Sequence, residues 1–293
     1  MSKSLTQRQF LQLLAQTSEE PLMVEIASAK GCHVYNQQGK KYFDLIAGIG
    51  VSSVGHRHPA IIDAIKSQAD KNLHVMVFGE FVQTPQVKLA EALSKTLPDP
   101  LEVTYFVNSG SEAAEGALKL AKRYTGRFNM ISCIDGYHGS SHGALSASGN
   151  ENLKQNFRPL LPGFQHIAFG DVSSLDLIDF NTAAVIIETV QGEAGVRIAN
   201  KTYFKKLRKK CNETGALLIL DEIQCGFGRT GKLWAFEHYD IQPDILLAAK
   251  GMGGGMPIGC FISSKEIMSS LKQNPILGHI TTFGGHPIST AAS

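Results

Sequence analysis

The chain alternates short apolar runs with longer stretches in which apolar residues recur at helical spacing. The apolar runs are rich in aliphatic and β-branched residues, which predicts strands. Seven such runs occur, at residues 103–107, 130–134, 167–169, 183–187, 216–220, 245–249 and 258–263. Continuous apolar strands separated by helices are typical of a sheet covered on both faces, so we predict an α/β fold with a mostly parallel seven-stranded sheet.

Several of the intervening stretches carry signals of helix ends. Helices are predicted at residues 58–73, 84–97, 109–126 and 201–213. The first two have proline at the first helical position. The third begins with Ser109 and Glu112, which have the spacing of a capping box, and ends at Gly126. A separate hairpin is expected at residues 34–45, upstream of the predicted sheet.

Composition excludes several classes of protein. The net charge of +2 is too small for a nucleic-acid-binding surface. No apolar run approaches the roughly 20 residues of a membrane span, and the first residues lack the apolar core of a signal peptide. The five cysteines are far apart and form no CxxC pair, which is typical of a reduced, cytoplasmic protein. We therefore expect a cytoplasmic protein.

Chemically active side chains follow five of the predicted strands. They include the segment Asn108–Ser111, Tyr137, Glu188, Asp221 and Lys250. In open α/β sheets, ligands bind outside the carboxyl ends of the strands. The sequence therefore predicts one ligand site at this edge of the sheet.

Lys250 lies between the apolar run 245–249 and a glycine cluster at 251–255. A lysine at the end of a strand commonly extends its amine into solvent. The glycines argue against that reading here, because they offer no side chains for packing and allow a ligand close to the backbone. A partly buried lysine of this kind can form a Schiff base with a carbonyl compound.

The other residues add to the same chemistry. Asp221 ends a buried strand and needs a cationic partner, such as a protonated pyridine nitrogen. Ser109, Gly110 and Ser111 are either a helix cap alone or also an anion site, and the two roles are compatible. Tyr137 is either a core aromatic or a ring that lies flat on a ligand. Together these parts fit pyridoxal 5′-phosphate.

A rival reading starts from residues 226–232, which match both GxGxxG and GxxxxGK. Leu233 stands where a P-loop needs Ser or Thr, and no good helix begins at Gly231. We therefore set aside a nucleotide site. The pair His56 and His58 is interpreted as a helix start, because the other ligands of a zinc site are absent.

Longer motifs then suggest a family. The stretches NSGSEAAEGALKLAKRYTGR, GYHG, LLILDEIQCGFGRTGKLWAFEHY, PDILLAAKGMGGGMPIG and TTFGGHP occur in this order. They resemble the class III pyridoxal-phosphate-dependent aminotransferases, which include ornithine, acetylornithine and 4-aminobutyrate aminotransferases. The resemblance runs from about Gly31 to the last residue.

The resemblance implies a role for each matching residue. Lys250 matches the lysine of the internal aldimine, and Asp221 matches the acid on the ring nitrogen; both are expected to be catalytic. The implied cofactor-binding residues are Ser109, Gly110, Ser111, Tyr137, His138, Glu188, Asp221, Gln224, Lys250 and Thr282. Thr282 is expected to reach the phosphate of a neighbouring subunit, which implies a homodimer with shared sites. Glu193 is the expected substrate-side residue, and no metal is expected.

The resemblance also implies an architecture, the large domain of the fold type I transferases. We expect an N-terminal segment with a small hairpin at residues 1–50 and a large cofactor-binding domain at 51–293. Relatives continue into a C-terminal small domain that this chain lacks, so a truncated chain is expected.

The implied reaction is transamination of an amino acid with a distal amine, with 2-oxoglutarate as acceptor. Two alternatives remain open at this point: a catalytically impaired cofactor-binding remnant or dimerisation partner, and an aminomutase. No nucleic-acid or membrane partner is expected.

Overall fold

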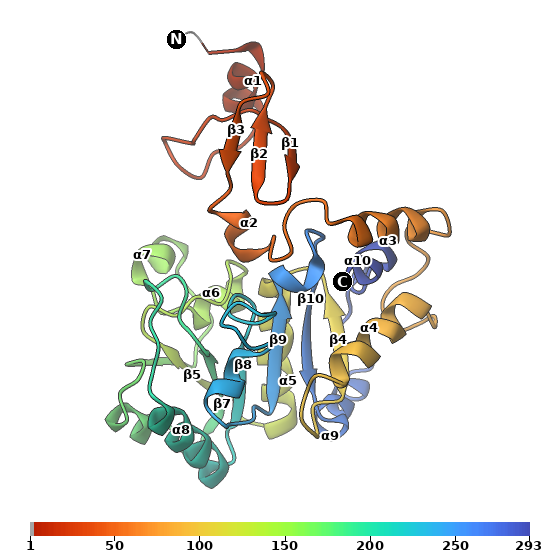
Figure 1. Ribbon diagram of the computed structural model, residues 1–293. Helices are drawn as coiled ribbons and strands as arrows, with labels where there is room; N and C mark the ends of the chain where they lie inside the picture. Colours follow the sequence, from red (N-terminus) through yellow and green to blue (C-terminus); the bar gives the residue numbers. More distant parts are fainter. Residues whose placement is uncertain (1–2) are drawn as a thin grey trace.

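Seven strands form the central sheet in the order β4-β10-β9-β8-β7-β5-β6, as a computed structural model of residues 3–293 shows (Figure 1). The strands are β4 (Val103–Val107), β5 (Asn129–Cys133), β6 (Phe164–Ile167), β7 (Thr182–Glu188), β8 (Leu217–Asp221), β9 (Ile245–Ala249) and β10 (Gly259–Ser263). β10 is antiparallel to both of its neighbours, and the other neighbouring strands are parallel. The predicted mostly parallel, seven-stranded sheet is confirmed.

The predicted bounds of one strand are wrong. β6 covers Phe164–Ile167 and not residues 167–169, because its pairing with β5 begins at Met130 opposite Phe164. The chain then turns at Gly170, whose φ of 83° lies in the left-handed region. The short apolar run at 167–169 therefore marks the end of the strand and the start of the turn.

Helices cover both faces of the sheet, as the apolar runs predicted. The longer helices are α3 (Pro59–Ala69), α4 (Thr84–Ser94), α5 (Gly110–Thr125) and α8 (Lys201–Thr214). The alanine- and leucine-rich face of α5 packs on one side of the sheet, together with Ile267 and Met268. Tyr203, Phe204 and Leu207 of α8 pack on the other side. The two cores explain why the strands are buried on both faces.

The shorter elements connect these parts. They are α1 (Leu5–Leu13), α2 (Ala47–Gly50), α6 (His142–Ala147), α7 (Glu151–Lys154), α9 (Lys265–Ser269) and α10 (Pro287–Ala292), with single 3₁₀ turns at Gln155–Phe157, Ser173–Leu177, Ala235–His238, Lys250–Gly253 and Ser270–Lys272. α10 packs against α3 and α4 (Figure 1). No helix within residues 3–293 has the length and apolar character needed to cross a membrane.

The predicted start of α5 is only half right. The Ser109 hydroxyl accepts a hydrogen bond from the Glu112 amide at 3.2 Å, as an N-cap should. The Glu112 carboxylate, however, accepts from the backbone and side chain of Asn108 and not from the Ser109 amide. The helix ends at Gly126, as predicted, with a φ of 68°.

The N-terminal region contains a second, three-stranded antiparallel sheet that stands apart from the first (Figure 1). Its strands are β1 (Ile26–Lys30), β2 (His33–Asn36) and β3 (Lys41–Phe43). The predicted hairpin corresponds to β2 and β3. β1 was not predicted, because four of its five residues are exposed and it lacks an apolar run.

Candidate active site at the carboxyl ends of the strands

A cavity of about 460 Å³ lies at the carboxyl ends of the parallel strands. Nine of the ten predicted cofactor-binding residues line it: Ser109, Gly110, Ser111, Tyr137, His138, Glu188, Asp221, Gln224 and Lys250. Residues from distant parts of the chain meet there because neighbouring strands end at the same edge of the sheet. The volume lies in the range of ordinary small-molecule sites.

Lys250 is the first residue after β9, and its backbone has the unusual φ of 47°. A non-glycine residue in this region is strained, and the surrounding structure must hold it there. The antiparallel partner β10 pins the preceding residue, since Ala249 pairs with Gly259. On the other side, a Cβ on Gly251 would lie 2.8 Å from the Ser53 hydroxyl, so the chain is tightly packed directly after the lysine.

Asp221 ends β8 and is 3% exposed. Its Oδ2 lies 2.8 Å from Nδ1 of His138, and its Oδ1 accepts from the Ile223 amide at 3.0 Å. The sequence predicted a cationic partner for this buried acid, and within the chain the partner is His138. Burial opposes charge on His138, but the hydrogen bond to Asp221 and the charges of Asp221 and Glu188 outweigh it and raise the His138 pKa.

Glu188 ends β7 and is 5% exposed. Burial raises its pKa to about 7, although the nearby His138 opposes this shift. Its two carboxyl oxygens accept from the Tyr137 amide at 3.0 Å and from the Gly192 amide at 3.1 Å. Glu188 therefore fixes the backbone of the loop that carries Tyr137.

The start of α5 forms a cradle for an anion. Ser109 caps the Glu112 amide, so the amides of Gly110 and Ser111, which have no partner within the helix, remain available to a ligand. A Cβ on Gly259 would overlap the Ser109 backbone, and a Cβ on Gly139 would overlap Ser111. Both glycines thus allow neighbouring segments to approach the cradle closely.

The parts of this cavity fit pyridoxal 5′-phosphate. The cradle offers backbone donors to a phosphate, and Asp221 offers a buried carboxylate to a protonated ring nitrogen. Lys250 lines the same cavity. His138 leaves its buried Nε2 without a hydrogen-bond partner among the described residues, so the hydrogen bond of its ring is the one to Asp221, while its backbone amide donates to the Ser148 hydroxyl at 3.1 Å.

Two predicted residues lie outside this lining. Glu193 is exposed, and its Oε1 accepts from Nε2 of Gln224 at 3.2 Å, so it lies next to the cavity. Thr282 is exposed on the loop before α10, away from the cavity lining. Its neighbour Thr281 is fixed by the Asn108 side chain at 3.1 Å.

Sequence reasoning missed the apolar residues of the lining, among them Val51, Met256 and Ile258. It also left Glu222 without a role. This buried carboxylate accepts from the Thr189 hydroxyl at 2.6 Å and from the amides of Ala235 and Phe236. Glu222 therefore joins the end of β8 to Thr189 and to the start of the 3₁₀ turn at Ala235–His238. In the sequence, only its place beside Asp221 after an apolar run indicated such a role.

The glycine-rich segment 226–231 has none of the geometry of a phosphate loop. It forms consecutive turns, with a φ of 84° at Gly228 and 88° at Gly231, and the next helical element is the single 3₁₀ turn at Ala235–His238. His56 pairs with Asp44 at 2.6 Å. Within residues 3–293, no cluster of three or more His, Cys, Asp or Glu residues is arranged to hold a metal ion.

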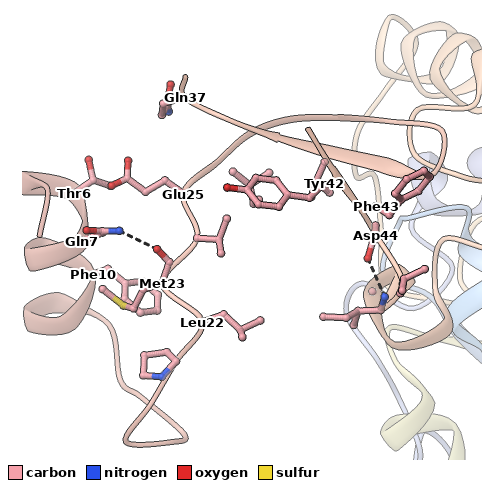
Figure 2. A pocket seen from close by; sticks show the side chains of 17 residues that line it. Thr6, Gln7, Phe10, Leu22, Met23, Glu25, Gln37, Tyr42, Phe43 and Asp44 are labelled. Atoms are coloured by element: carbon pink, nitrogen blue, oxygen red, sulfur yellow. Dashed lines mark hydrogen bonds between the residues drawn. The ribbon is translucent and has the colours of Figure 1, made fainter. Parts of the chain in front are cut away.

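A second and larger cavity, of about 750 Å³, lies in the N-terminal region between α1, β2 and β3 (Figure 2). Phe10, Leu22 and Tyr42 line it, and no lysine or histidine does. Of its two acids, Glu25 and Asp44, the second accepts from the Ile46 and Ala47 amides at 3.1 and 2.8 Å. This cavity is mostly apolar, and it lacks an amine that could react.

Comparison with known proteins agrees with the fold. The Aminotransferase class-III family matches residues 14–293. The chain is 43% identical over 270 residues to the acetylornithine aminotransferase of Methanopyrus kandleri, covering 92% of this chain and 68% of the relative. It is 45% identical to the putrescine aminotransferase of Pectobacterium atrosepticum, covering 87% of this chain and 56% of that protein. The chain thus spans about two thirds or less of the length of these relatives.

Solved structures show the same architecture. The ornithine aminotransferase of Toxoplasma gondii ME49 superposes with a TM-score of 0.90 at 32% identity, over 99% of this chain and 70% of that one. A transaminase from the marine bacterium Virgibacillus gives a TM-score of 0.91 at 28% identity, over 98% and 71% of the two chains. The chain belongs to the class III aminotransferase family. It is a pyridoxal-phosphate-dependent aminotransferase with the large-domain architecture of fold type I.

Proposed function

We propose that this cavity carries out transamination of a donor with a distal amine, such as ornithine, acetylornithine or 4-aminobutyrate, with 2-oxoglutarate as acceptor. The observation that carries the proposal is the convergence of Lys250, Asp221 and the start of α5 on one cavity. The names of the relatives support the donor class, because acetylornithine, ornithine and putrescine all carry a distal amine. The acceptor follows from the family resemblance.

The residues would hold pyridoxal phosphate as follows. The amides of Gly110 and Ser111, after the Ser109 cap, would bind the phosphate. Asp221 would bind the ring nitrogen, and Gln224 would lie near the ring hydroxyl. Tyr137 would lie on the face of the ring.

When bound, the cofactor supplies an aldehyde that accepts the amino group and a pyridine ring that accepts electron density. Lys250 would hold the cofactor covalently in the resting enzyme through Nζ. With its amine free, Nζ would take a proton from the substrate carbon as a general base and would return a proton as a general acid. The Asp221 carboxylate would keep the ring nitrogen protonated, and His138 would keep Asp221 in place.

Three further parts belong to the same proposal. Glu193, beside Gln224, would act on the substrate side of the site. Thr282 would reach the phosphate of a second subunit in a homodimer. Residues 51–293 would be the large cofactor-binding domain, preceded by the N-terminal segment that ends at residue 50, and the enzyme would act in the cytoplasm.

The test is an absorbance spectrum after addition of pyridoxal phosphate, followed by borohydride reduction and peptide mapping. The proposal expects a visible band and reduced cofactor on Lys250. Addition of an amino donor should then give one turnover to the pyridoxamine form and release a free oxo compound. A band without turnover would favour a cofactor-binding remnant, and turnover without a released oxo compound would favour an aminomutase. Label on another lysine would contradict the assigned site.

A further inference from the structure

A carboxylate outside the cavity lining, Glu115, is tied to the anion cradle by a chain of hydrogen bonds. Glu115 lies one turn after Ser111 on α5. Its Oε1 accepts from the Ser141 hydroxyl at 2.7 Å, from the Gly143 amide at 2.7 Å and from the Ala144 amide at 3.0 Å. A carboxylate can only accept, so all three groups must be donors. One oxygen of Glu115 thus caps the start of α6 and fixes the Ser141 hydrogen.

This assignment determines the direction of the next hydrogen bond. The hydroxyl oxygens of Ser111 and Ser141 are 2.6 Å apart, and the distance alone permits either donor. Ser141 has a single hydroxyl hydrogen, and it donates this hydrogen to Glu115. Ser111 is therefore the donor, and its oxygen accepts from the Ser141 amide at 3.0 Å. The Ser111 hydroxyl hydrogen is thus directed at Ser141 and not at an anion, whereas the Ser111 backbone amide remains available to the anion.

The same contacts fix the loop between β5 and α6. Gly139 adopts a φ of 129° and lies so close to Ser111 that a Cβ there would overlap it. Tyr137 and His138 come directly before this contact, and Ser141 comes directly after it. Glu188 and Asp221 hold Tyr137 and His138 from the side of the sheet, and the contact between Ser111 and Ser141 holds the same loop against the cradle.

We propose that Glu115 is a positioning residue for the cofactor, which acts through Ser141 and Ser111 to lock the loop carrying Tyr137 and His138 onto the start of α5. Its carboxylate sets the direction of the Ser111 and Ser141 hydroxyl groups, so that the Ser111 hydroxyl does not donate to the phosphate. This inference rests on the proposed function, since it assumes pyridoxal phosphate in the cavity.

The chain offers a matched pair of variants. Glu115→Ala removes the acceptor and should reorient the loop. Glu115→Gln keeps an acceptor oxygen, and its amide has space because Gly143 has no side chain beside Oε2. Ser141→Ala removes the hydroxyl that links Glu115 to Ser111, and it leaves Glu115 to accept from the Gly143 and Ala144 amides. It therefore tests the proposal even if Glu115→Ala does not fold.

The experiment follows the cofactor bound to the purified protein by visible circular dichroism, phosphorus NMR and equilibrium titration. Glu115→Ala, Ser141→Ala and Ser111→Ala should each change the visible dichroism and weaken cofactor binding about 10-fold, the equivalent of ~1.4 kcal/mol. Glu115→Gln should restore both. The double variant Ser111→Ala with Ser141→Ala should lose no more cofactor affinity than either single variant, because both changes break the same contact between the two serines. The phosphorus resonance should not move in Ser111→Ala.

Three results would overturn the assignment of Glu115 alone: a shifted phosphorus resonance in Ser111→Ala, additive losses in the double variant, or an equal loss in Glu115→Gln and Glu115→Ala. Each would mean that the hydroxyl contacts the phosphate or that the contacts do not form one unit. A wild-type protein that binds no pyridoxal phosphate would overturn the proposed function as well, so the two failures are distinguishable.

Discussion

Two cavities of this protein, one in the N-terminal region and one at the strand ends, differ in size and in chemistry, and the smaller of them has the properties of an active site. The N-terminal cavity, of about 750 Å³, is formed by mostly exposed elements, and α1 has no buried residue. The cavity at the strand ends, of about 460 Å³, is built on strands whose last residues are buried. Only the second brings together an amine, a buried acid and free backbone donors. Convergence of side chains from rigid strands, and not volume, identifies the site.

The difference also concerns how firmly each acid is held. Asp221 is buried at a strand end and pairs with a buried histidine. Asp44 pairs with His56, but it belongs to a loop between a small exposed sheet and the short helix α2. The following changes test whether the two regions are as independent as these surroundings suggest.

The largest expected effect comes from Lys250→Ala. Transamination should fall at least ~10³-fold, because positioned acid–base groups typically contribute 10²–10⁴-fold and the covalent link is lost as well. Steady-state rates of the purified protein and borohydride labelling measure this. Lys232→Ala, which changes an exposed lysine of the nearby glycine-rich loop, is the control. Activity above a tenth of wild type in Lys250→Ala would remove this lysine from the mechanism.

Asp221→Asn should lower the turnover rate roughly 10- to 100-fold, in line with the 1.5–3 kcal/mol of a hydrogen bond to a charged group. The amide cannot hold a proton on the ring nitrogen by charge. The same change in the other cavity, Asp44→Asn, should leave turnover near wild type. Equal losses in the two variants would mean that the two regions are coupled.

Gly259→Ala should weaken cofactor binding about 10-fold, because a Cβ would overlap the Ser109 backbone and overpacking typically costs ~1–3 kcal/mol. Lys232→Ala, at an exposed residue outside the cavity lining, is again the control. Titration with pyridoxal phosphate gives both affinities. Unchanged binding in Gly259→Ala would mean that the cradle tolerates displacement.

The two regions should respond to pH with opposite signs. The Glu188 pKa is raised from 4.5 to about 7, so its contribution to stability is full below pH 4.5 and is lost as the pH rises through 7. The loss is on the order of 1–3 kcal/mol. The Asp44 pKa is lowered below 3.8, chiefly by the hydrogen bond from His56, so its contribution is present above that pH and is lost on acidification.

Denaturant unfolding of the cofactor-free protein between pH 3 and pH 8 separates the two contributions. Glu188→Gln should flatten the decline between pH 4.5 and 7, and Asp44→Asn should flatten only the loss in acid. A decline that persists unchanged in Glu188→Gln would assign it to another group.

The smallest effect is expected from Phe10→Ala, which shortens a side chain in the lining of the N-terminal cavity. Cofactor affinity should stay within about 2-fold of wild type, because changes away from buried features usually stay within ~0.5 kcal/mol. Titration measures it, and a tenfold loss would connect the apolar cavity to the cofactor.

Much of the fold could be predicted because the strands are buried on both faces. In β7 and β9 every residue is buried, and continuous apolar runs mark them in the sequence. β1 and the bounds of β6 could not be predicted, since their residues are held by pairing with a neighbour and not by an apolar face.

The candidate site followed from the same rule, since Glu188, Asp221 and Lys250 each lie at the end of an apolar run. Sequence did not predict which groups would meet. The pairing of Asp221 with His138 joins residues 83 positions apart, and Glu115 reaches Ser141 across 26. Such contacts depend on the register of strands and loops, which local pattern does not encode.

The antiparallel strand β10 has a mechanical consequence. By pairing with the last residue before Lys250, it turns the backbone at the lysine into a fixed pivot, with Gly251 wedged against Ser53 on the far side. The backbone of Lys250 is therefore held in place, and only its side chain is free to rotate. In the proposed reaction, rotation about the bonds of this side chain would be enough to move the amine between the two reacting carbon atoms, without movement of the sheet.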